Sequence, residues 1–153
     1  MKLTKIETAI GSGLYTGFSP YFPGTAGSIA AVLIYLIPGF ENPTLMLFFI
    51  IFFTAVGIPI ASNFEKIYGK DPRQCTIDEF VGTWISLLFV PKKAIFILLA
   101  FIIWRLLDIF KPFPARQLEN IKGGIGIMFD DIVSGLYSLI IIHILVSLTS
   151  RMY

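Results

Sequence analysis

Apolar runs separated by short polar segments constrain this chain more than any other feature. There are five of them, at residues 26–37, 44–62, 77–90, 94–103 and 132–149. A helix needs about 20 apolar residues to cross a bilayer at right angles, and the second and fifth runs approach that length. The others either extend into flanking polar residues or form a short hairpin within one leaflet. The pattern predicts an all-α, polytopic helical membrane protein with about five apolar helices, some of them short.

The composition supports a membrane protein of one domain. Hydrophobic residues make up 56% of the 153 residues and charged residues only 14%, with a mean hydropathy of +0.80. A soluble domain has about a quarter charged residues. The length fits a single membrane-embedded domain over residues 1–153. A net charge of +2, spread along the chain, does not suggest a nucleic-acid partner. One cysteine, Cys75, excludes an intramolecular disulfide and a thiolate zinc site.

The basic residues predict how the helices are oriented. If the N-terminus lies inside, the inner side receives Lys2, Lys5, Lys66, Lys70, Arg73, Arg105, Lys111, Arg116 and Lys122. The outer side receives only Lys92, Lys93 and Arg151. This excess is what the positive-inside rule predicts for an N-in, C-out protein. In that topology the N-terminal ends of the first, third and fifth helices meet the C-terminal end of the fourth at the inner face.

The fourth run ends in a charged stretch, residues 104–114 (WRLLDIFKPFP). Arg105 and Asp108 are i, i+3 neighbours on one face of a helix, and Lys111 lies about one turn further on. Two prolines then end the helix. Taken alone, the stretch fits a snorkelling arginine with a surface ion pair as well as it fits a functional site.

Polar motifs begin the first and third helices. Residues 23–28 (PGTAGS) have backbone N–H groups that could hold a phosphate, with the Thr25 or Ser28 hydroxyl adding a bond. A simple N-cap is the alternative. Thr76 and Glu79 match a capping box.

Five carboxylates belong to these helix ends: Asp78, Glu79, Asp108, Asp130 and Asp131. Acidic residues favour helix starts, but so many at one membrane face would repel one another. A divalent cation removes that repulsion, and hard oxygen ligands favour Mg²⁺. Neighbouring side chains diverge by about 100° around a helix, so one residue of an adjacent acidic pair is expected to bind the ion and the other to orient or cap.

His143 lies in the middle of the fifth run. An ionisable residue at that depth can be functional. A neutral histidine bonded to a neighbouring helix is the favoured interpretation.

Four blocks of residues, in this order, resemble the phosphatidylglycerophosphatase A family. The first joins residues 11–13 (GSG) to residues 23–28, and the second is DEFVG at residues 78–82. The third is RLLDIFKP at residues 105–112, and the fourth is GGIGIMFDDIVSG at residues 123–135. Trp104, Ser134 and Ile77 depart from the family pattern, but no charged motif residue is missing.

The resemblance implies a bacterial inner-membrane, Mg²⁺-dependent phosphatase. Such an enzyme hydrolyses phosphatidylglycerophosphate to phosphatidylglycerol and inorganic phosphate. It would be a multi-pass protein with its active site on the cytoplasmic side. Its partners would be the lipid substrate and the bilayer, and the oligomeric state stays open.

The motifs and the resemblance together predict the site residues, in three overlapping groups. The expected metal ligands are Glu79, Asp108 and Asp131, with Asp78 or Asp130 nearby. The expected substrate contacts are Thr25, Gly27, Ser28, Arg105 and Lys111, of which the two cations would clamp the phosphate. The expected catalytic residues are Asp108, Arg105, Lys111 and Asp130. Attack by water and a phospho-aspartate intermediate both remain open.

Two other classes of function stay open from the residues. A small cation carrier or channel would line a permeation path with the carboxylates and place them at mid-membrane depth. A structural or assembly subunit would not need the carboxylates to converge. An enzyme requires the charged residues to meet in one pocket at the inner face.

Overall fold

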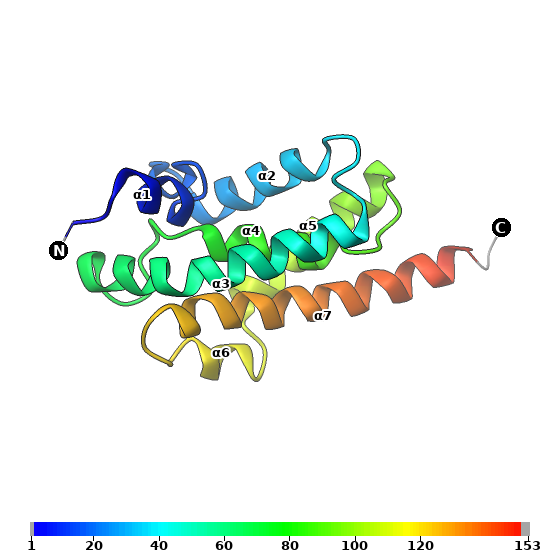
Figure 1. Cartoon of the computed structure of the whole chain (residues 1–153). Helices are drawn as coiled ribbons and strands as arrows, with labels where there is room; N and C mark the ends of the chain where they lie inside the picture. The colour runs from blue at the N-terminus through cyan, green and yellow to red at the C-terminus, as the bar shows by residue number, and fades with distance from the viewer. Residues whose placement is uncertain (1, 151–153) are drawn as a thin grey trace.

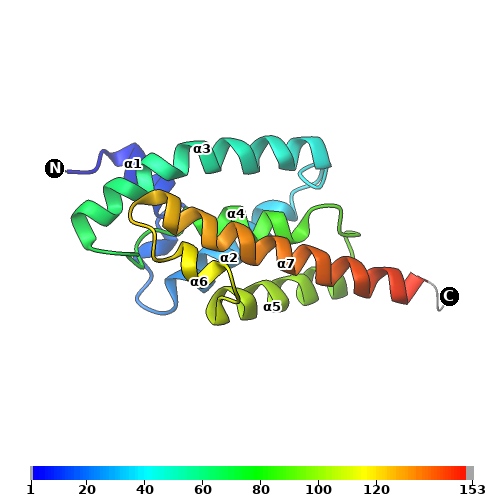
Figure 2. The same ribbon diagram turned by 90° about the horizontal axis from the view of Figure 1, so that it is seen from below.

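The computed structural model describes residues 2–150 and is all-helical over that range, with seven α-helices, one 3₁₀-helix and no strand. In chain order the elements are α1 (Lys5–Gly11), η1 (Thr16–Phe18), α2 (Pro23–Tyr35), α3 (Pro43–Tyr68), α4 (Ile77–Leu87), α5 (Ala94–Phe110), α6 (Ala115–Leu118) and α7 (Gly124–Ser150). The long helices run along a common direction (Figures 1 and 2). The short α1 and α6 lie at the end of the bundle where α7 begins (Figure 1).

Helix α4 forms the centre of the bundle. Every residue from Ile77 to Leu87 is buried, and α2, α3, α5 and α7 all pack against the helix. In both views α4 lies among the longer helices (Figures 1 and 2). A helix surrounded on all sides has no face for solvent or lipid, so its polar side chains, Asp78, Glu79, Thr83 and Ser86, are buried with the apolar ones.

Local sequence explains where the longest helix begins and ends. Asn42 precedes α3 and its Oδ1 accepts hydrogen bonds from the backbone N–H groups of Thr44 and Leu45. Pro43 occupies the first turn, where its missing N–H costs nothing. Gly69 follows the helix at a φ of 96°, a conformation that glycine adopts without strain.

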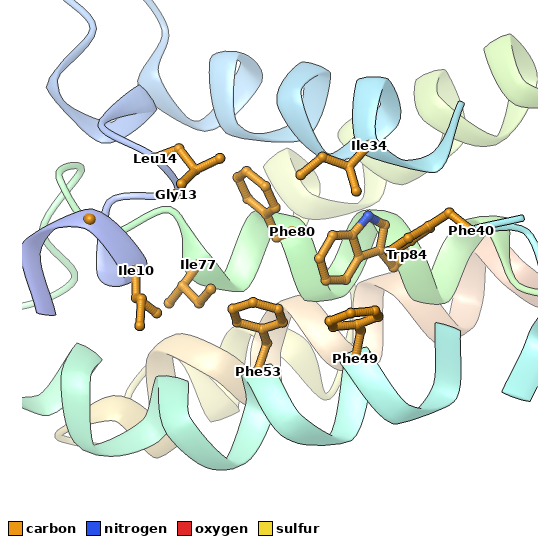
Figure 3. A pocket seen from close by; sticks show the side chains of 11 residues that line it. Ile10, Gly13, Leu14, Ile34, Phe40, Phe49, Phe53, Ile77, Phe80 and Trp84 are labelled. Carbon is orange, nitrogen blue, oxygen red and sulfur yellow. The ribbon is translucent and has the colours of Figure 1, made fainter. Parts of the chain in front are cut away.

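Aromatic side chains fill the space between α2, α3 and α4, around an apolar cavity of about 240 Å³ (Figure 3). The rings of Phe40, Phe53 and Phe80 lie 5.1–5.7 Å from the ring of Trp84, centroid to centroid. Trp84 Nε1 donates to the Ala31 carbonyl at 3.0 Å, so the indole satisfies its one polar atom within the core.

The expectation of five apolar, membrane-crossing helices is confirmed in part. All five predicted runs contain a helix, but within residues 2–150 only α3 and α7 are long and apolar enough to cross a membrane. Helices α2, α4 and α5 have 13, 11 and 17 residues. Part of the third run is not helical at all, because α4 ends at Leu87.

His143 follows the favoured interpretation. Its Nε2 lies 3.0 Å from the carbonyl oxygen of Leu88, the residue after α4. The imidazole therefore links α7 to the end of a neighbouring helix.

Candidate active site

Three helix ends meet at one side chain, Glu79 in the first turn of α4. Ser28 of α2 donates from its hydroxyl to Glu79 Oε2 at 2.9 Å. Arg105 of α5 forms an ion pair with the same oxygen and a second one, at 2.7 Å, with Asp108. The predicted meeting of the start of α2 and the start of α4 with the end of α5 is therefore present.

Asp131, about two turns into α7, completes the cluster. One oxygen from each of Glu79, Asp108 and Asp131 lies within 4.8 Å of the other two. The three residues are only 9%, 9% and 3% exposed. Buried carboxylates at this spacing repel one another unless a cation shares them.

The two adjacent acidic pairs adopt the same local arrangement. Asp78 Oδ1 accepts from the backbone N–H of Glu79 at 3.0 Å, and Asp130 Oδ1 accepts from the backbone N–H of Asp131 at 2.9 Å. In each pair the first carboxylate holds the backbone while the second points into the cluster. Geometry thus separates an orienting residue from a candidate ligand in both pairs.

The predicted capping box at Thr76 and Glu79 is wrong. The Thr76 side chain makes no capping bond to α4; its hydroxyl lies 3.1 Å from the hydroxyl of Thr16. Glu79 is drawn away by Ser28 and Arg105, because a buried carboxylate gains more from a cation than from one backbone N–H. A complete capping box occurs instead at Thr4 and Glu7, which begin α1.

The basic residues of the site are already paired with acidic ones. Lys111 forms ion pairs with Asp130 and, at 3.6 Å, with Glu119. Burial by itself would lower the pKa of Lys111, but the adjacent Asp130 carboxylate outweighs burial and raises that pKa above its usual range. Lys111 therefore remains an ammonium across the physiological pH range.

Arg105 contacts several oxygen atoms and still has one N–H donor without a partner among the described residues. Its Nη2 lies 3.5 Å from Thr25 Oγ1, and its Nη1 lies 3.4 Å from Ser28 Oγ. Its Nε is buried and has no hydrogen-bond partner among the described residues. A buried N–H without an acceptor is costly, so an anionic ligand would improve the site.

The start of α2 approaches α4 too closely for any side chain larger than hydrogen. A Cβ on Gly24 would lie 2.2 Å from Glu79 Oε1. A Cβ on Gly27 would lie 3.0 Å from Thr76 Cβ and 3.4 Å from Glu79 Cβ. Of the predicted substrate contacts, Thr25 lies beside Arg105 and Ser28 beside Arg105 and Glu79. Gly27 instead allows α2 to pack closely against Thr76 and Glu79 of α4.

A polar cavity of about 300 Å³ opens at these helix ends. Its lining includes all five predicted carboxylates and Lys111, and it also includes residues that were not predicted: Asp71, Arg73, Cys75 and Glu119. They come from the polar segments between the second and third apolar runs and between the fourth and fifth. In these segments no local pattern separates a site residue from a surface charge. Burial raises the pKa of the Cys75 thiol well above its usual value, which argues against a thiolate nucleophile.

The donor set fits a hard divalent cation. Glu79, Asp108 and Asp131 offer carboxylate oxygens only, the ligands that Mg²⁺ prefers. Seven carboxylates and two cations, Arg73 and Lys111, line the cavity, and Arg105 pairs with two of those carboxylates, so the ionised cluster has an excess of negative charge. A divalent cation would reduce that excess.

Sequence comparisons show which family the chain belongs to. The chain matches the family described as "Phosphatidylglycerophosphatase A" over residues 9–146. A "Putative phosphatidylinositol-3-phosphatase" of Bacteroides thetaiotaomicron is 41% identical over 147 residues, which cover 91% of this chain and 92% of the relative. The "Phosphatidylglycerophosphatase A" of Escherichia coli K12 is 35% identical, with 90% of this chain and 82% of the relative covered. The Haemophilus influenzae protein of the same name is 32% identical, with 88% and 83% covered. No solved structure matches significantly.

The fold and the site define a helical protein with a buried acidic centre at the ends of its helices. The chain belongs to the phosphatidylglycerophosphatase A family, and it is a phosphatase.

Proposed function

We propose that this phosphatase hydrolyses phosphatidylglycerophosphate to phosphatidylglycerol and inorganic phosphate, with Mg²⁺ as its cofactor. The observation that carries the proposal is the close approach of Glu79, Asp108 and Asp131 beside Arg105 and Lys111. A phosphate monoester needs a cation to polarise it and positively charged donors to neutralise it. The choice of substrate follows the names of the relatives from E. coli and H. influenzae.

In this proposal each residue has a distinct task. Mg²⁺ would be held by Glu79, Asp108 and Asp131, where it would act as a Lewis acid toward a phosphate oxygen. Arg105 would donate to the phosphate from its unpaired Nε. Lys111 would add a second positive charge.

Asp78 and Asp130 would keep the ligand residues in place through their bonds to the next backbone N–H. Asp130 would also hold Lys111 at the rim of the cavity. Thr25 and Ser28 would fix the guanidinium of Arg105.

The proposed setting is a multi-pass membrane protein with the site at the cytoplasmic face. Helices α3 and α7 are long enough to cross by themselves. The charged residues of the site lie in the first turn of α4, at the end of α5 and about two turns into α7, and none lies near the middle of a helix. That placement suits a lipid headgroup at the interface. The comparisons lend no support to a cation carrier.

A phosphate-release assay tests the proposal. Purified protein in detergent should release phosphate from phosphatidylglycerophosphate, lose that activity on addition of EDTA and regain it with excess Mg²⁺. Heat-inactivated protein is the control. Activity untouched by EDTA would refute the metal proposal without refuting the substrate.

A second candidate substrate is a phosphatidylinositol monophosphate, because the Bacteroides relative is 41% identical to this chain. Both lipids carry a phosphate monoester on a polyhydroxylated headgroup, so one metal and arginine site could act on either. The same assay, run with both lipids at equal mole fraction, distinguishes them by kcat/KM. A preference above tenfold, about 1.4 kcal/mol of transition-state binding, would identify the substrate.

A further inference from the structure

An apolar groove runs along the outside of the bundle between α2 and α5, with a volume of about 290 Å³. Its α2 wall includes Ile29, Leu33 and Leu36, and its α5 wall includes Leu98 and Phe101. Four of these side chains are 46–61% exposed, the exception being Phe101. In the proposed membrane setting, these exposed apolar walls face acyl chains rather than water.

The groove ends one helical turn from residues that contact the acidic site. Thr25 lies one helical turn before Ile29 on α2, and Arg105 lies one turn after Phe101 on α5, so each polar residue shares a face with a wall residue. At this end the two helices are joined by polar contacts, including a hydrogen bond from Trp104 Nε1 to Ser28 Oγ at 3.4 Å. Along the rest of its length the groove is apolar.

The apolar cavity beside Trp84 has no such connection. It lies against Ile77, Phe80 and Trp84 on α4 (Figure 3), whereas Asp78 and Glu79 line the polar cavity. The tight contact of Gly27 with Thr76 and Glu79 closes the space between α2 and α4. An apolar chain attached to a phosphate in the site would therefore enter the α2–α5 groove.

We propose that the α2–α5 groove binds one acyl chain of the lipid substrate while the phosphate ester lies at the helix ends. This inference rests on the proposed function and adds where the lipid tail lies. From residue 29 to residue 36, or from 94 to 101, the groove is about 10 Å long at 1.5 Å per residue. It holds the part of the chain next to the headgroup, and the remainder stays among the bilayer lipids.

The role of such a groove is orientation rather than affinity. Neighbouring lipid tails are as apolar as its walls, so a chain gains little by leaving them. Held between the two helices that carry Thr25 and Arg105, however, the chain fixes the direction from which the phosphate approaches. Positioning of this kind acts on the rate of the chemical step.

A photolabelling experiment tests the location without relying on turnover. The full chain in detergent is mixed with phosphatidylglycerophosphate that carries a diazirine in one acyl chain, illuminated, and analysed by peptide mass spectrometry. Most of the label should lie on α2 and α5. Leu33→Trp and Leu98→Trp, which fill the groove from opposite walls, should each reduce that label severalfold. Ile51→Trp, at an equally exposed position on α3, should not.

Turnover provides the second measurement. The ratio of kcat/KM for the lipid to kcat/KM for its deacylated analogue should fall about tenfold or more in Leu33→Trp and Leu98→Trp. It should keep the wild-type value in Ile51→Trp. Thermal unfolding identifies any variant that fails to fold, and two groove variants keep the test decisive.

The outcomes separate the two proposals. Label spread evenly over the exposed faces of α3 and α7 would overturn the groove, as would an unchanged ratio in both groove variants. Label confined to α2 and α5 with no phosphate released by the wild type would support the groove as a lipid site and refute the proposed reaction.

Discussion

At the scale of single residues, Arg105 organises the site. Its guanidinium joins Glu79 of α4 to Asp108 one turn away on its own helix, and it reaches Thr25 on α2. Because an arginine presents several donors in a fixed plane, it can hold two carboxylates and still offer a hydrogen bond to a ligand. Removing either carboxylate would change the position of that remaining donor.

Asp108→Asn should lower kcat at least about a hundredfold, because it removes a proposed metal ligand and the partner of Arg105 together. Phosphate release at saturating lipid measures the effect. Glu41→Gln is the matched control, since Glu41 is paired with Lys92 outside the site. Near-normal turnover of Asp108→Asn, in protein that unfolds at the wild-type temperature, would exclude Asp108 from catalysis.

The sequence predicted the carboxylates of the site but not their contacts. Asp78, Glu79 and Asp108 lie at helix ends and Asp130 and Asp131 about two turns into α7, and all five line one cavity, as the expected convergence at one face predicts. Local pattern misassigned Glu79 to a capping box, since the side chain that binds it, Ser28, lies 51 positions away. Long-range competition of this kind leaves no local signal.

At the scale of elements, α4 depends on how closely its neighbours can approach. A Cβ on Gly82 would lie 2.1 Å from the indole ring of Trp104, a side chain with no exposed surface. The glycine therefore allows α5 to pack against α4. The same indole donates to Ser28, so this packing also holds α2 beside the site.

Gly82→Ala should destabilise the protein by about 1–3 kcal/mol, because the added methyl group displaces a buried, rigid indole. Gly57→Ala is the control: its Cβ would crowd the flexible end of Met128, at 2.9 Å, and make an ordinary contact with Ile77, at 3.6 Å. There the gain in helix propensity, up to about 1 kcal/mol, should offset the crowding. Thermal unfolding in detergent measures both. Equal melting temperatures for the two variants would contradict this account of α4 and α5.

The sequence predicted where the main helices lie along the chain, but not which residues surround each helix. The apolar runs at residues 44–62 and 132–149 correspond to α3 and α7, although α7 begins eight residues earlier, at Gly124. The short α6 has four residues and no apolar period, so no pattern could predict it. The complete burial of α4 depends on four partner helices and could not be derived from its own sequence.

At the scale of the whole molecule, the paired charged side chains lie at the two opposite ends of the bundle. The acidic site, Arg105 and Lys111 lie at one end. The loops after α2 and α4 lie at the other, where Lys92 pairs with Glu41 at 2.8 Å and donates to the Ile37 carbonyl at 3.2 Å. The two ends suit the two faces of a membrane.

Cysteine labelling should therefore place Lys66 and Lys93 on opposite sides of the membrane. Both lysines are exposed, and Cys75, the one native cysteine, is buried. A membrane-impermeant maleimide should label Lys93→Cys in intact cells and Lys66→Cys only after permeabilisation. Wild-type protein controls for reaction at Cys75. Labelling of both variants in intact cells would contradict the N-in topology.

The burial of α4 has a consequence for how the enzyme tolerates different membranes. With 11 residues, the helix is about 16 Å long, roughly half the hydrocarbon thickness of a bilayer. A lipid-exposed helix of that length would thin the membrane around it. Because other helices enclose α4, its length need not match the bilayer. Thickness acts on α3 and α7 instead. Helix α3 carries none of the five carboxylates and can tilt while they stay fixed relative to one another, whereas α7 carries Asp131.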